Sequence, residues 1–587
     1  MLMRLFNNVP QLRSLTVAAQ LPIAYSWPSR DRQGANVWVI LLFVALNLAA
    51  NAAVPVRAKQ AMVVTRESHA TDAGVAALKA GGNAVDAAVA VGMALAVTHP
   101  SAGNLGGGGF MLIRFADGKT TFIDFRERAP GKASRDMYLD AAGNVTKDSL
   151  VGYRAPGVPG TVRGLEFAHK KYGRAKWSGL VDPAVKLARD GFPVSYGLAS
   201  SLRSTKALSQ FPESKRIFQK NGNFYEPGEI ILQPELAATL ARIAAQGSAD
   251  FYEGETARRF AKEIAAGGGL ISLADLKNYA ATERKPLEGS YRGYKLITAP
   301  PPSSGGVGML QMMGVLEKSG YEKNGAGSAS AIHWAAESMR RYYADRAEYL
   351  GDPDFVSVPI ARLLDTRYIA KLRSSIDPAH ATPSDQVRPG DLKAYESSET
   401  THFSIVDKDG NAVAVTYTLN GGYGSGVTLP GLGFLLNNEM DDFSAKPGVP
   451  NMFGVIGGDA NAIQPGKRPL SSMTPTIVLK NGKPFLVVGT PGGSRIITSV
   501  METILNVIDF GMNIQDAVNY PRFHHQWRPD QLQLEPGISP DTRALLEQRG
   551  HSIEIIRSIC EISAIQFEDK WLAGAADPRT EGKAAGY

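Results

Sequence analysis

The sequence of 587 residues contains a single cysteine, Cys560, so no disulfide can form within the chain. A protein of this length must then be stabilised by buried apolar surface, and hydrophobic residues make up 44% of the sequence. The neighbours of Cys560 between positions 558 and 562 offer no obvious base for a catalytic thiolate. We therefore expect Cys560 to be a small packed residue and not a nucleophile.

Clusters of one charge sign are also absent. The formal net charge is +7, but no run of Lys or Arg accompanies it, which gives nucleic-acid binding little support. Neither an internal repeat nor a low-complexity tract is visible, and this argues against a repeat architecture. The 61 glycines instead predict many tight turns and close backbone contacts.

An apolar run from Val37 to Ala50 is shorter than the roughly 20 residues that a membrane span needs. Arg30 and Arg32 precede it, and Ala50-Asn51-Ala52 follows as a small-x-small cleavage motif. Residues 1–52 are therefore predicted to be a signal peptide, and the mature protein to be periplasmic or, alternatively, secreted. An uncleaved anchor is the competing interpretation.

Beyond Val63 the pattern alternates between strands and helices of small residues, with two Ala-rich helices expected between Thr71 and His99. A glycine cluster at residues 103–109 leads into a predicted strand at 110–114. Its spacing does not fit the dinucleotide fingerprint, so a packing role is favoured. Amphipathic helices such as 234–245 follow, and then a polar, Pro-punctuated stretch at 373–399 that we expect to be exposed and poorly packed.

Residues 402–419 predict a β-hairpin, because two alternating runs flank Asp409-Gly410. If residues 408–410 form a three-residue loop with Gly410 in the left-handed region, one face of the hairpin is wholly apolar. The other face is small and mostly polar, apart from Val406. This register places Thr418 across from Thr400, with Asn420 next along on the same side.

Thr400 and Thr418 place a pair of hydroxyls at the start of a strand, directly after the polar linker at residues 373–399. This arrangement suits an N-terminal nucleophile that is exposed by cleavage of the linker. The Thr400 hydroxyl attacks the carbonyl of Glu399, and hydrolysis of the resulting ester frees the α-amine of Thr400. That amine has an unperturbed pKa of about 7.7–8.0, which suits a general base. Simple β-propensity of Thr400-Thr401 is the alternative explanation of the hairpin taken alone.

Several longer motifs carry a resemblance. Residues 399–420 (ETTHFSIVDKDGNAVAVTYTLN) are similar to the start of the small subunit of bacterial γ-glutamyltransferases. Further matches occur along nearly the whole chain after residue 52: DFRERAP (124–130), PPPSSGG (300–306), YADRAEY (343–349), NNEMDDF (437–443), KRPLSSM (467–473) and GTPGGSR (489–495).

The resemblance implies an α+β fold, the four-layer αββα sandwich of N-terminal-nucleophile hydrolases. It also implies an autoprocessed heterodimer, with a large subunit at 53–399 and a small catalytic subunit at 400–587. The implied activity is γ-glutamyl transfer and glutathione hydrolysis, through an ester on Thr400. Water, an amino acid or a peptide accepts the γ-glutamyl group, and no metal or other cofactor is implied.

The resemblance also assigns roles to residues. Thr400 matches the nucleophile and Thr418 the partner that positions it. Arg126 matches the binder of the substrate α-carboxylate, for which a bidentate guanidinium is suited, with a structural Arg126–Glu127 pair as the alternative. The positions that match the remaining substrate contacts are Asn420, Glu439 and Asp442 for the α-ammonium group, and Ser471 and Ser472 for the carboxylate pocket.

Gly492 and Gly493 precede a helical pattern, so their backbone N–H groups can stabilise an oxyanion; a plain helix entry is the alternative. Without the resemblance, Asp441-Asp442 would be interpreted as a solvated pair or a weak metal site, and no His lies near in sequence to favour a metal.

Residues 446–458 resemble a lid over the pocket. Phe453 stands there where a tyrosine is usual, so the balance between hydrolysis and transfer is open.

Two other functions remain as alternatives. A related acylase would use the same threonine chemistry on glutaryl-β-lactam or poly-γ-glutamate amides. An exported binding protein would keep the fold without catalysis. The retention of Arg126 with the acidic pair argues against the first, and the intact set of Thr400, Thr418, Gly492 and Gly493 argues against the second.

Overall fold

A computed structural model describes residues 52–388, 400–446, 449, 452 and 457–587. The predicted signal peptide up to residue 51, the carbonyl side of the Glu399–Thr400 bond and the lid residue Phe453 lie outside the described residues. Within the described residues, no helix is both long and apolar enough to cross a membrane.

Two seven-stranded sheets form the centre of residues 54–587, and neighbouring strands in both are antiparallel. The first sheet has the order β1 (Val56–Ala58), β20 (Trp571–Ala576), β19 (Ser563–Glu568), β15 (Lys483–Gly489), β14 (Thr476–Lys480), β11 (Tyr294–Thr298) and β10 (Leu287–Tyr291). The second has the order β21 (Lys583–Gly586), β2 (Met62–Thr65), β12 (Thr401–Val406), β13 (Ala412–Thr418), β3 (Gly108–Arg114), β4 (Thr120–Phe125) and β9 (Thr282–Arg284).

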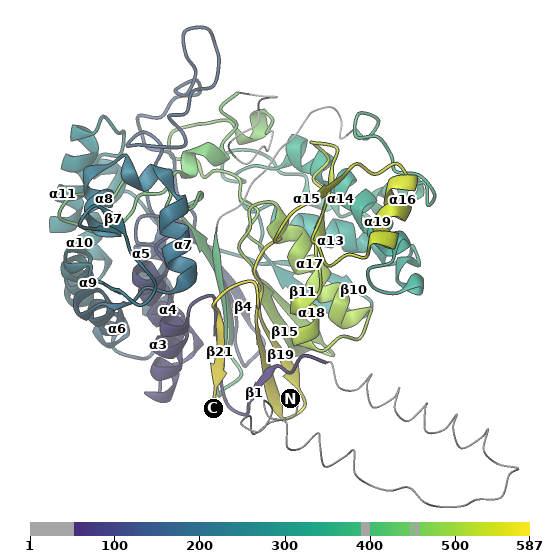
Figure 1. Cartoon of the computed structure of the whole chain (residues 1–587), viewed down its shortest axis with the longest axis horizontal. Helices are drawn as coiled ribbons and strands as arrows, with labels where there is room; N and C mark the ends of the chain where they lie inside the picture. Colours follow the sequence, from purple (N-terminus) through teal and green to yellow (C-terminus); the bar gives the residue numbers. More distant parts are fainter. Residues whose placement is uncertain (1–51, 389–399, 447–448, 450–451, 453–456) are drawn as a thin grey trace, which may run out of the picture. The chain divides into compact units, whose positions relative to one another are not determined.

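Helices cover the outer face of each sheet (Figure 1). The second sheet is covered by α3 (Ser68–Lys79), α4 (Ala84–Thr98), α5 (Thr161–Tyr172), α6 (Trp177–Asp190), α7 (Tyr196–Ser204), α8 (Pro212–Phe218), α9 (Pro234–Gln246), α10 (Ser248–Tyr252), α11 (Glu255–Ala266) and α12 (Leu273–Lys277). The first is covered by α13 (Gly305–Leu316), α14 (Ala329–Tyr349), α15 (Ile360–Leu363), α16 (Thr366–Ser374), α17 (Arg495–Ile508) and α18 (Ile514–Asn519). The last helix, α19 (Pro540–Gln548), packs on α14 in a small separate core. The predicted αββα sandwich is confirmed.

Three small sheets lie outside this sandwich. They are β5 (Phe192–Pro193) with β8 (Ile230–Ile231), β6 (Gln219–Lys220) with β7 (Asn223–Phe224), and β16 (Phe523–His524) with β17 (Leu532–Leu534) and β18 (Ile553–Ile555).

The Ala-rich composition of α3 and α4 follows from their close packing. Every residue of α4 is buried, so no polar face is needed, and its first turn is fixed by a capping box between Asn83 and Asp86. A Cβ added to Gly74 of α3 would lie only 2.6 Å from Val91 Cγ2 of α4. Larger side chains on these helices would force them apart.

The glycine cluster at 103–109 has the packing role that its spacing predicts. A Cβ on Gly106 would lie 2.2 Å from the carbonyl oxygen of Leu435, and a Cβ on Gly107 would lie 2.0 Å from that of Thr418. Both contacts are shorter than any side chain tolerates. The absence of a Cβ therefore lets this segment lie directly against the end of β13.

The hairpin of β12 and β13 has the predicted register. Ile405 pairs with Val413 and Thr401 with Tyr417, and Gly410 has a φ of 88° in the turn. The apolar face packs under α3–α12. The opposite face lies inside the sandwich against the first sheet, so both faces are buried.

Most positions from 373 to 388 are exposed, as predicted, but Ile376, Ser384 and Val387 are buried. The indole Nε1 of Trp527 donates to the carbonyls of Ser384 (2.7 Å) and Val387 (2.9 Å). Asp530 accepts from the Ser384 amide at 2.7 Å. Polar, Pro-rich composition indicated exposure, but side chains distant in sequence satisfy this backbone.

Both sheets combine strands from either side of the Glu399–Thr400 bond. Residues before it supply β1, β10 and β11 to the first sheet and β2, β3, β4 and β9 to the second. Residues after it supply β14, β15, β19 and β20 to the first, and β12, β13 and β21 to the second. The two segments therefore share one pair of sheets and do not form separate domains.

Candidate active site

Thr400 is buried and directly precedes β12, opposite the end of β13. Its hydroxyl is 3.5 Å from the Thr418 hydroxyl, and its side chain is 4% exposed. Thr418 Oγ1 also accepts a hydrogen bond from the Asn420 amide at 2.8 Å. The sheet register thus brings together the three residues that the hairpin pattern placed on one side.

The loop after β13 connects this pair to an acidic turn. Asn420 has a φ of 76°, a left-handed conformation that asparagine tolerates better than most residues. Its side chain donates to the carbonyl of Asn438 at 3.0 Å, and the Gly421 amide donates to Asn438 Oδ1 at 2.8 Å. Asn438 directly precedes the 3₁₀ turn η4 (Glu439–Asp442), so these bonds hold Asn420 beside the start of the acidic turn.

Arg126 follows β4 and is 1% exposed. Its guanidinium donates to the carbonyls of Pro469 (3.2 Å) and Leu470 (3.3 Å) and forms ion pairs with Glu439 and Asp442. Residues separated by more than 300 positions therefore converge on one buried cation. The alternative partner Glu127 lies 3.6 Å from Nη1, so it contributes to the cluster but is not the main partner.

This cluster has more carboxylates than cations. Burial raises the pKa of Glu127 to about 7, against the opposing effect of Arg126. Burial also raises the pKa of Glu439 well above its usual value, and repulsion from Glu127 and Asp442 adds to the shift. A ligand that brings its own positive charge beside these acids would stabilise their ionised forms.

Ser471 and Ser472 directly follow the two carbonyls that hold Arg126. The Ser471 hydroxyl accepts from the Met473 amide at 3.1 Å, and Arg346 donates to the Ser472 hydroxyl at 3.1 Å. Arg346 also donates to Ser304 Oγ at 2.9 Å. Arg346 and Ser304 were not among the predicted site residues, although both lie in motifs that carry the family resemblance.

Gly492 and Gly493 form the turn between β15 and α17, with φ values of 133° and 59°. The end of β15 packs on β12, since a Cβ on Gly489 would lie 2.2 Å from His402 Cε1. His402 is two residues after Thr400. This contact places the glycine turn at the same end of the sandwich as Thr400.

Asp441 is a residue whose environment the sequence did not indicate. It is 5% exposed, accepts from Ser149 Oγ (2.7 Å) and from the Met452 amide (2.7 Å), and is not a solvated neighbour of Asp442. Burial raises its pKa to about 7. The local sequence gives no signal for this role, because Ser149 is distant in the chain and Met452 approaches only through the fold of the loop that follows.

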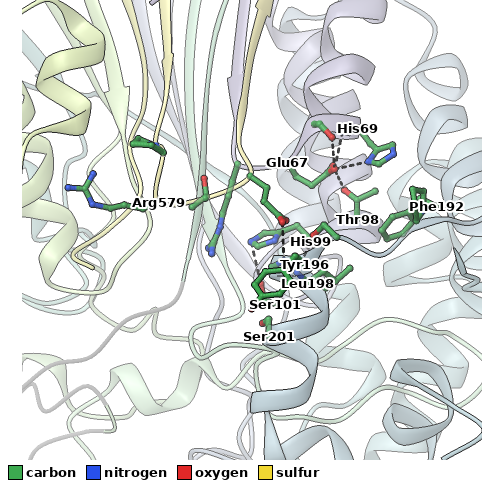
Figure 2. A pocket seen from close by; sticks show the side chains of 18 residues that line it. Glu67, His69, Thr98, His99, Ser101, Phe192, Tyr196, Leu198, Ser201 and Arg579 are labelled. Carbon is green, nitrogen blue, oxygen red and sulfur yellow. Dashed lines mark hydrogen bonds and ion pairs between the residues drawn. The ribbon is translucent and has the colours of Figure 1, made fainter. Parts of the chain in front are cut away.

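A separate cavity of about 410 Å³ lies between α3, α7 and residues 578–581 (Figure 2). None of the predicted site residues lines it. Its partly buried Glu67 already accepts hydrogen bonds from the His69 ring (2.7 Å), the Thr98 hydroxyl (2.6 Å) and two backbone amides. These bonds outweigh burial and lower the Glu67 pKa to about 2, so this carboxylate has a structural role.

Comparison with known proteins decides the family. The family described as gamma-glutamyltranspeptidase matches residues 70–587. A glutathione hydrolase proenzyme of Escherichia coli (strain K12) is 53% identical over 538 residues, which cover 91% of this chain and 93% of that protein. The chain belongs to the gamma-glutamyltranspeptidase family.

Solved structures agree with this placement. The gamma-glutamyltranspeptidase of Helicobacter pylori is 46% identical with a TM-score of 0.55, over 55% of this chain and 94% of that chain. A cephalosporin acylase from Bacillus halodurans has a TM-score of 0.81 at 28% identity, over 97% of this chain and 99% of that chain. The same architecture therefore occurs in gamma-glutamyltranspeptidases and in an acylase, and the site must distinguish between them.

Proposed function

We propose that this member of the gamma-glutamyltranspeptidase family is a proenzyme that cuts itself before Thr400 and then transfers γ-glutamyl groups. The observation that carries the proposal is the buried hydroxyl pair of Thr400 and Thr418, 3.5 Å apart at the start of β12. Glutathione is the proposed donor, since the E. coli relative at 53% identity is a glutathione hydrolase proenzyme.

Before cleavage the Thr400 nitrogen is an amide and cannot accept a proton. The Thr400 hydroxyl attacks the carbonyl carbon of Glu399, the C–N bond breaks as the nitrogen takes up a proton, and water hydrolyses the ester. The freed amine, with an unperturbed pKa of about 7.7–8.0, then takes the proton of the Thr400 hydroxyl as it attacks a γ-glutamyl amide. Thr418 holds the nucleophile in position through its own hydroxyl.

Arg126 is proposed to bind the α-carboxylate of the substrate, with Ser471 and Ser472 completing that pocket. Glu439, Asp442 and Asn420 are proposed to hold the α-ammonium group. The excess of acidic groups around Arg126 supports this assignment, because an incoming ammonium would offset their mutual repulsion. A zwitterionic γ-glutamyl group supplies both charges.

Gly492 and Gly493 are proposed to direct their N–H groups at the developing oxyanion. Removal of one such donor typically slows turnover by roughly 100- to 1,000-fold. Water releases glutamate from the ester, whereas an amino acid or a peptide gives transfer.

We further propose that residues 1–52 direct export to the periplasm and are removed there. The positively charged Arg30 and Arg32, the apolar run and the small-x-small motif support this assignment. Detection of a mature chain that starts near residue 53 in a periplasmic fraction would support export. A full-length chain in the membrane fraction would favour an anchor.

An acylase is the second candidate, supported by the TM-score of 0.81 with cephalosporin acylase. Its glutaryl substrate lacks the α-ammonium group, so the acids around Arg126 would have no counterpart in it. Turnover of a γ-glutamyl anilide and of a glutaryl anilide by the same preparation separates the two activities.

The test is a denaturing gel with turnover of a γ-glutamyl anilide. Wild type should give two fragments that meet at Thr400, Thr400→Ala should stay uncut and inactive, and Thr400→Ser should still cut itself. Thr401→Val is the matched control, because the Thr401 hydroxyl has no hydrogen-bond partner within the described residues. If Thr400→Ala cut itself and released the anilide, the proposal would be wrong.

A further inference from the structure

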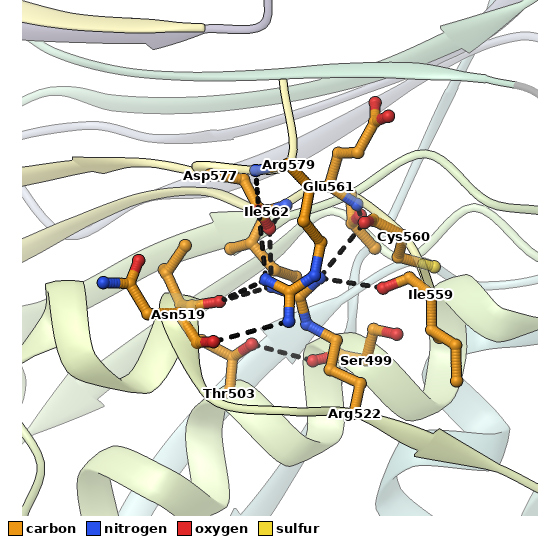
Figure 3. Close-up of polar contacts among 12 residues, drawn as sticks. Ser499, Thr503, Asn519, Arg522, Ile559, Cys560, Glu561, Ile562, Asp577 and Arg579 are labelled. Atoms are coloured by element: carbon orange, nitrogen blue, oxygen red, sulfur yellow. Dashed lines mark hydrogen bonds and ion pairs between the residues drawn. The ribbon is translucent and has the colours of Figure 1, made fainter. Parts of the chain in front are cut away.

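A buried ion pair, Arg522 with Asp577, holds the loop at residues 558–562 (Figure 3). Arg522 donates to the carbonyls of Ile559 (2.8 Å) and Cys560 (3.1 Å) and pairs with Asp577 at 2.5 Å. The Asp577 carboxylate in turn accepts from the Ile562 amide at 2.8 Å. A fixed loop results, in which Cys560 adopts a φ of 62° that L-residues rarely take.

This loop is attached to the turn that contains Gly492 and Gly493, here called the glycine loop (residues 490–493). The Glu561 amide donates to Thr490 Oγ1 at 2.9 Å. A Cβ on Gly492 would lie 2.2 Å from the Sγ of Cys560, so the sulfur occupies the space that a side chain at 492 would need. The thiol is therefore in direct contact with Gly492 Cα.

We infer that Cys560 is a positioning residue, which sets the backbone of Gly492 so that the glycine loop presents its N–H groups to the oxyanion. The inference rests on the proposed function, in which those N–H groups act. Gly492 has a φ of 133° and no side chain, so its own rotamer preferences cannot fix its conformation. The fixed sulfur replaces that missing restraint on one side of the loop.

The chemistry of the thiol suits this role. Burial raises the Cys560 pKa to about 12, so it remains a neutral, compact group at physiological pH and places no charge beside the oxyanion. Alanine would leave a void beside Gly492, whereas serine keeps an atom at the γ position.

The experiment compares Cys560→Ala and Cys560→Ser with wild type in self-cleavage, melting temperature, and kcat and KM for a γ-glutamyl anilide. Val507→Ala is the control, since it removes volume from the buried side of α17 near its far end. For Cys560→Ala we expect kcat to fall about 10- to 100-fold with KM nearly unchanged, as small misplacements of catalytic groups cost up to about 100-fold. Cys560→Ser should retain most of kcat.

A Cys560→Ala kcat equal to that of Val507→Ala at similar melting temperatures would overturn the inference. So would a loss that lies in KM alone, because it would indicate a distorted substrate pocket. If Cys560→Ala does not fold, Cys560→Gly takes its place in the same kcat comparison, because glycine also removes the sulfur and readily adopts the φ of 62° at this position. Failure of the proposed function is recognised separately, because wild type would then release no anilide or Thr400→Ala would still release it.

Discussion

At the scale of single residues, the guanidinium of Arg126 is held in place by several buried partners. It is buried, donates to two carbonyls and pairs with acids from a distant turn. Lysine would keep the positive charge but could not form the same planar, forked set of hydrogen bonds. The geometry of the pocket thus depends on arginine and not on charge alone.

Arg126→Lys is therefore expected to lower kcat/KM for a γ-glutamyl anilide by roughly 10- to 150-fold, which corresponds to about 1.5–3 kcal/mol for a hydrogen bond to a charged group. Steady-state kinetics of the cleaved enzyme measures this. Arg189→Lys, at an exposed ion pair with Asp190, should leave kcat/KM unchanged. Equal values for both variants would contradict the role given to Arg126.

A second residue-scale prediction concerns the pH dependence of stability at Asp441. Because burial raises its native pKa to about 7, the native state keeps a proton that the unfolded chain releases near pH 4. The contribution of this proton to the free energy of unfolding is fully present below about pH 4 and is lost as the pH rises through about 7. Asp441→Asn should therefore make the unfolding free energy fall less steeply over that range, by at most about 1.4 kcal/mol per pH unit.

Urea unfolding at several pH values between 4 and 7 tests this, in a Thr400→Ala background that keeps one chain. Asp148→Asn serves as the control, since the Asp148 side chain is 47% exposed and pairs at 3.5 Å with an exposed Arg154. Identical pH slopes for Asp441→Asn and Asp148→Asn would show that Asp441 is ionised in the native state.

At the scale of elements, the β12–β13 hairpin is fixed at its two ends by different glycines. Gly410 provides the left-handed turn, with no atom near an added Cβ. Gly107 lies at the other end, where an added Cβ would be 2.0 Å from the Thr418 carbonyl. The first glycine is needed for conformation and the second for close contact with the end of β13.

Gly107→Ala is expected to displace Thr418 and abolish both self-cleavage and anilide turnover. Gly410→Ala should cost about 1–2 kcal/mol of stability through its left-handed conformation but leave turnover intact. A gel time course, melting temperatures and kcat for both variants measure the difference. Normal self-cleavage by Gly107→Ala would show that the contact with β13 is not required.

At the scale of the whole molecule, cleavage before Thr400 would not create two independent halves. Within each sheet, strands from residues before and after this bond are hydrogen-bonded neighbours, such as β2 with β12 and β13 with β3. Separation of the fragments would break both sheets and expose both large cores.

The two fragments should accordingly co-elute on native size exclusion and separate only in denaturant, and the segment from Thr400 expressed alone should not fold. Size exclusion of the cleaved protein with and without urea tests this, with the uncut Thr400→Ala chain as the reference. Elution of the fragments at separate volumes without denaturant would contradict the interleaved arrangement.

The sequence alone determined the features that depend on neighbours along the chain. Alternation on both sides of Gly410 specified the hairpin register, because a shift by one residue would exchange the two faces. The Ala-rich pattern predicted close-packed helices, and the glycine cluster predicted close backbone contact. The family motifs named Arg126, Glu439 and Asp442, although nothing local linked them.

Tertiary structure decided what depends on contacts between distant segments. Only the folded chain places three acids around Arg126, buries Asp441 or sets the sulfur of Cys560 against Gly492. The anchored positions Ser384 and Val387 in the polar stretch before residue 389 were missed for the same reason, since Trp527 and Asp530 satisfy their backbone from far along the chain. Burial and charge proximity set pKa values and positions, and both arise only when strands from the two segments meet in shared sheets.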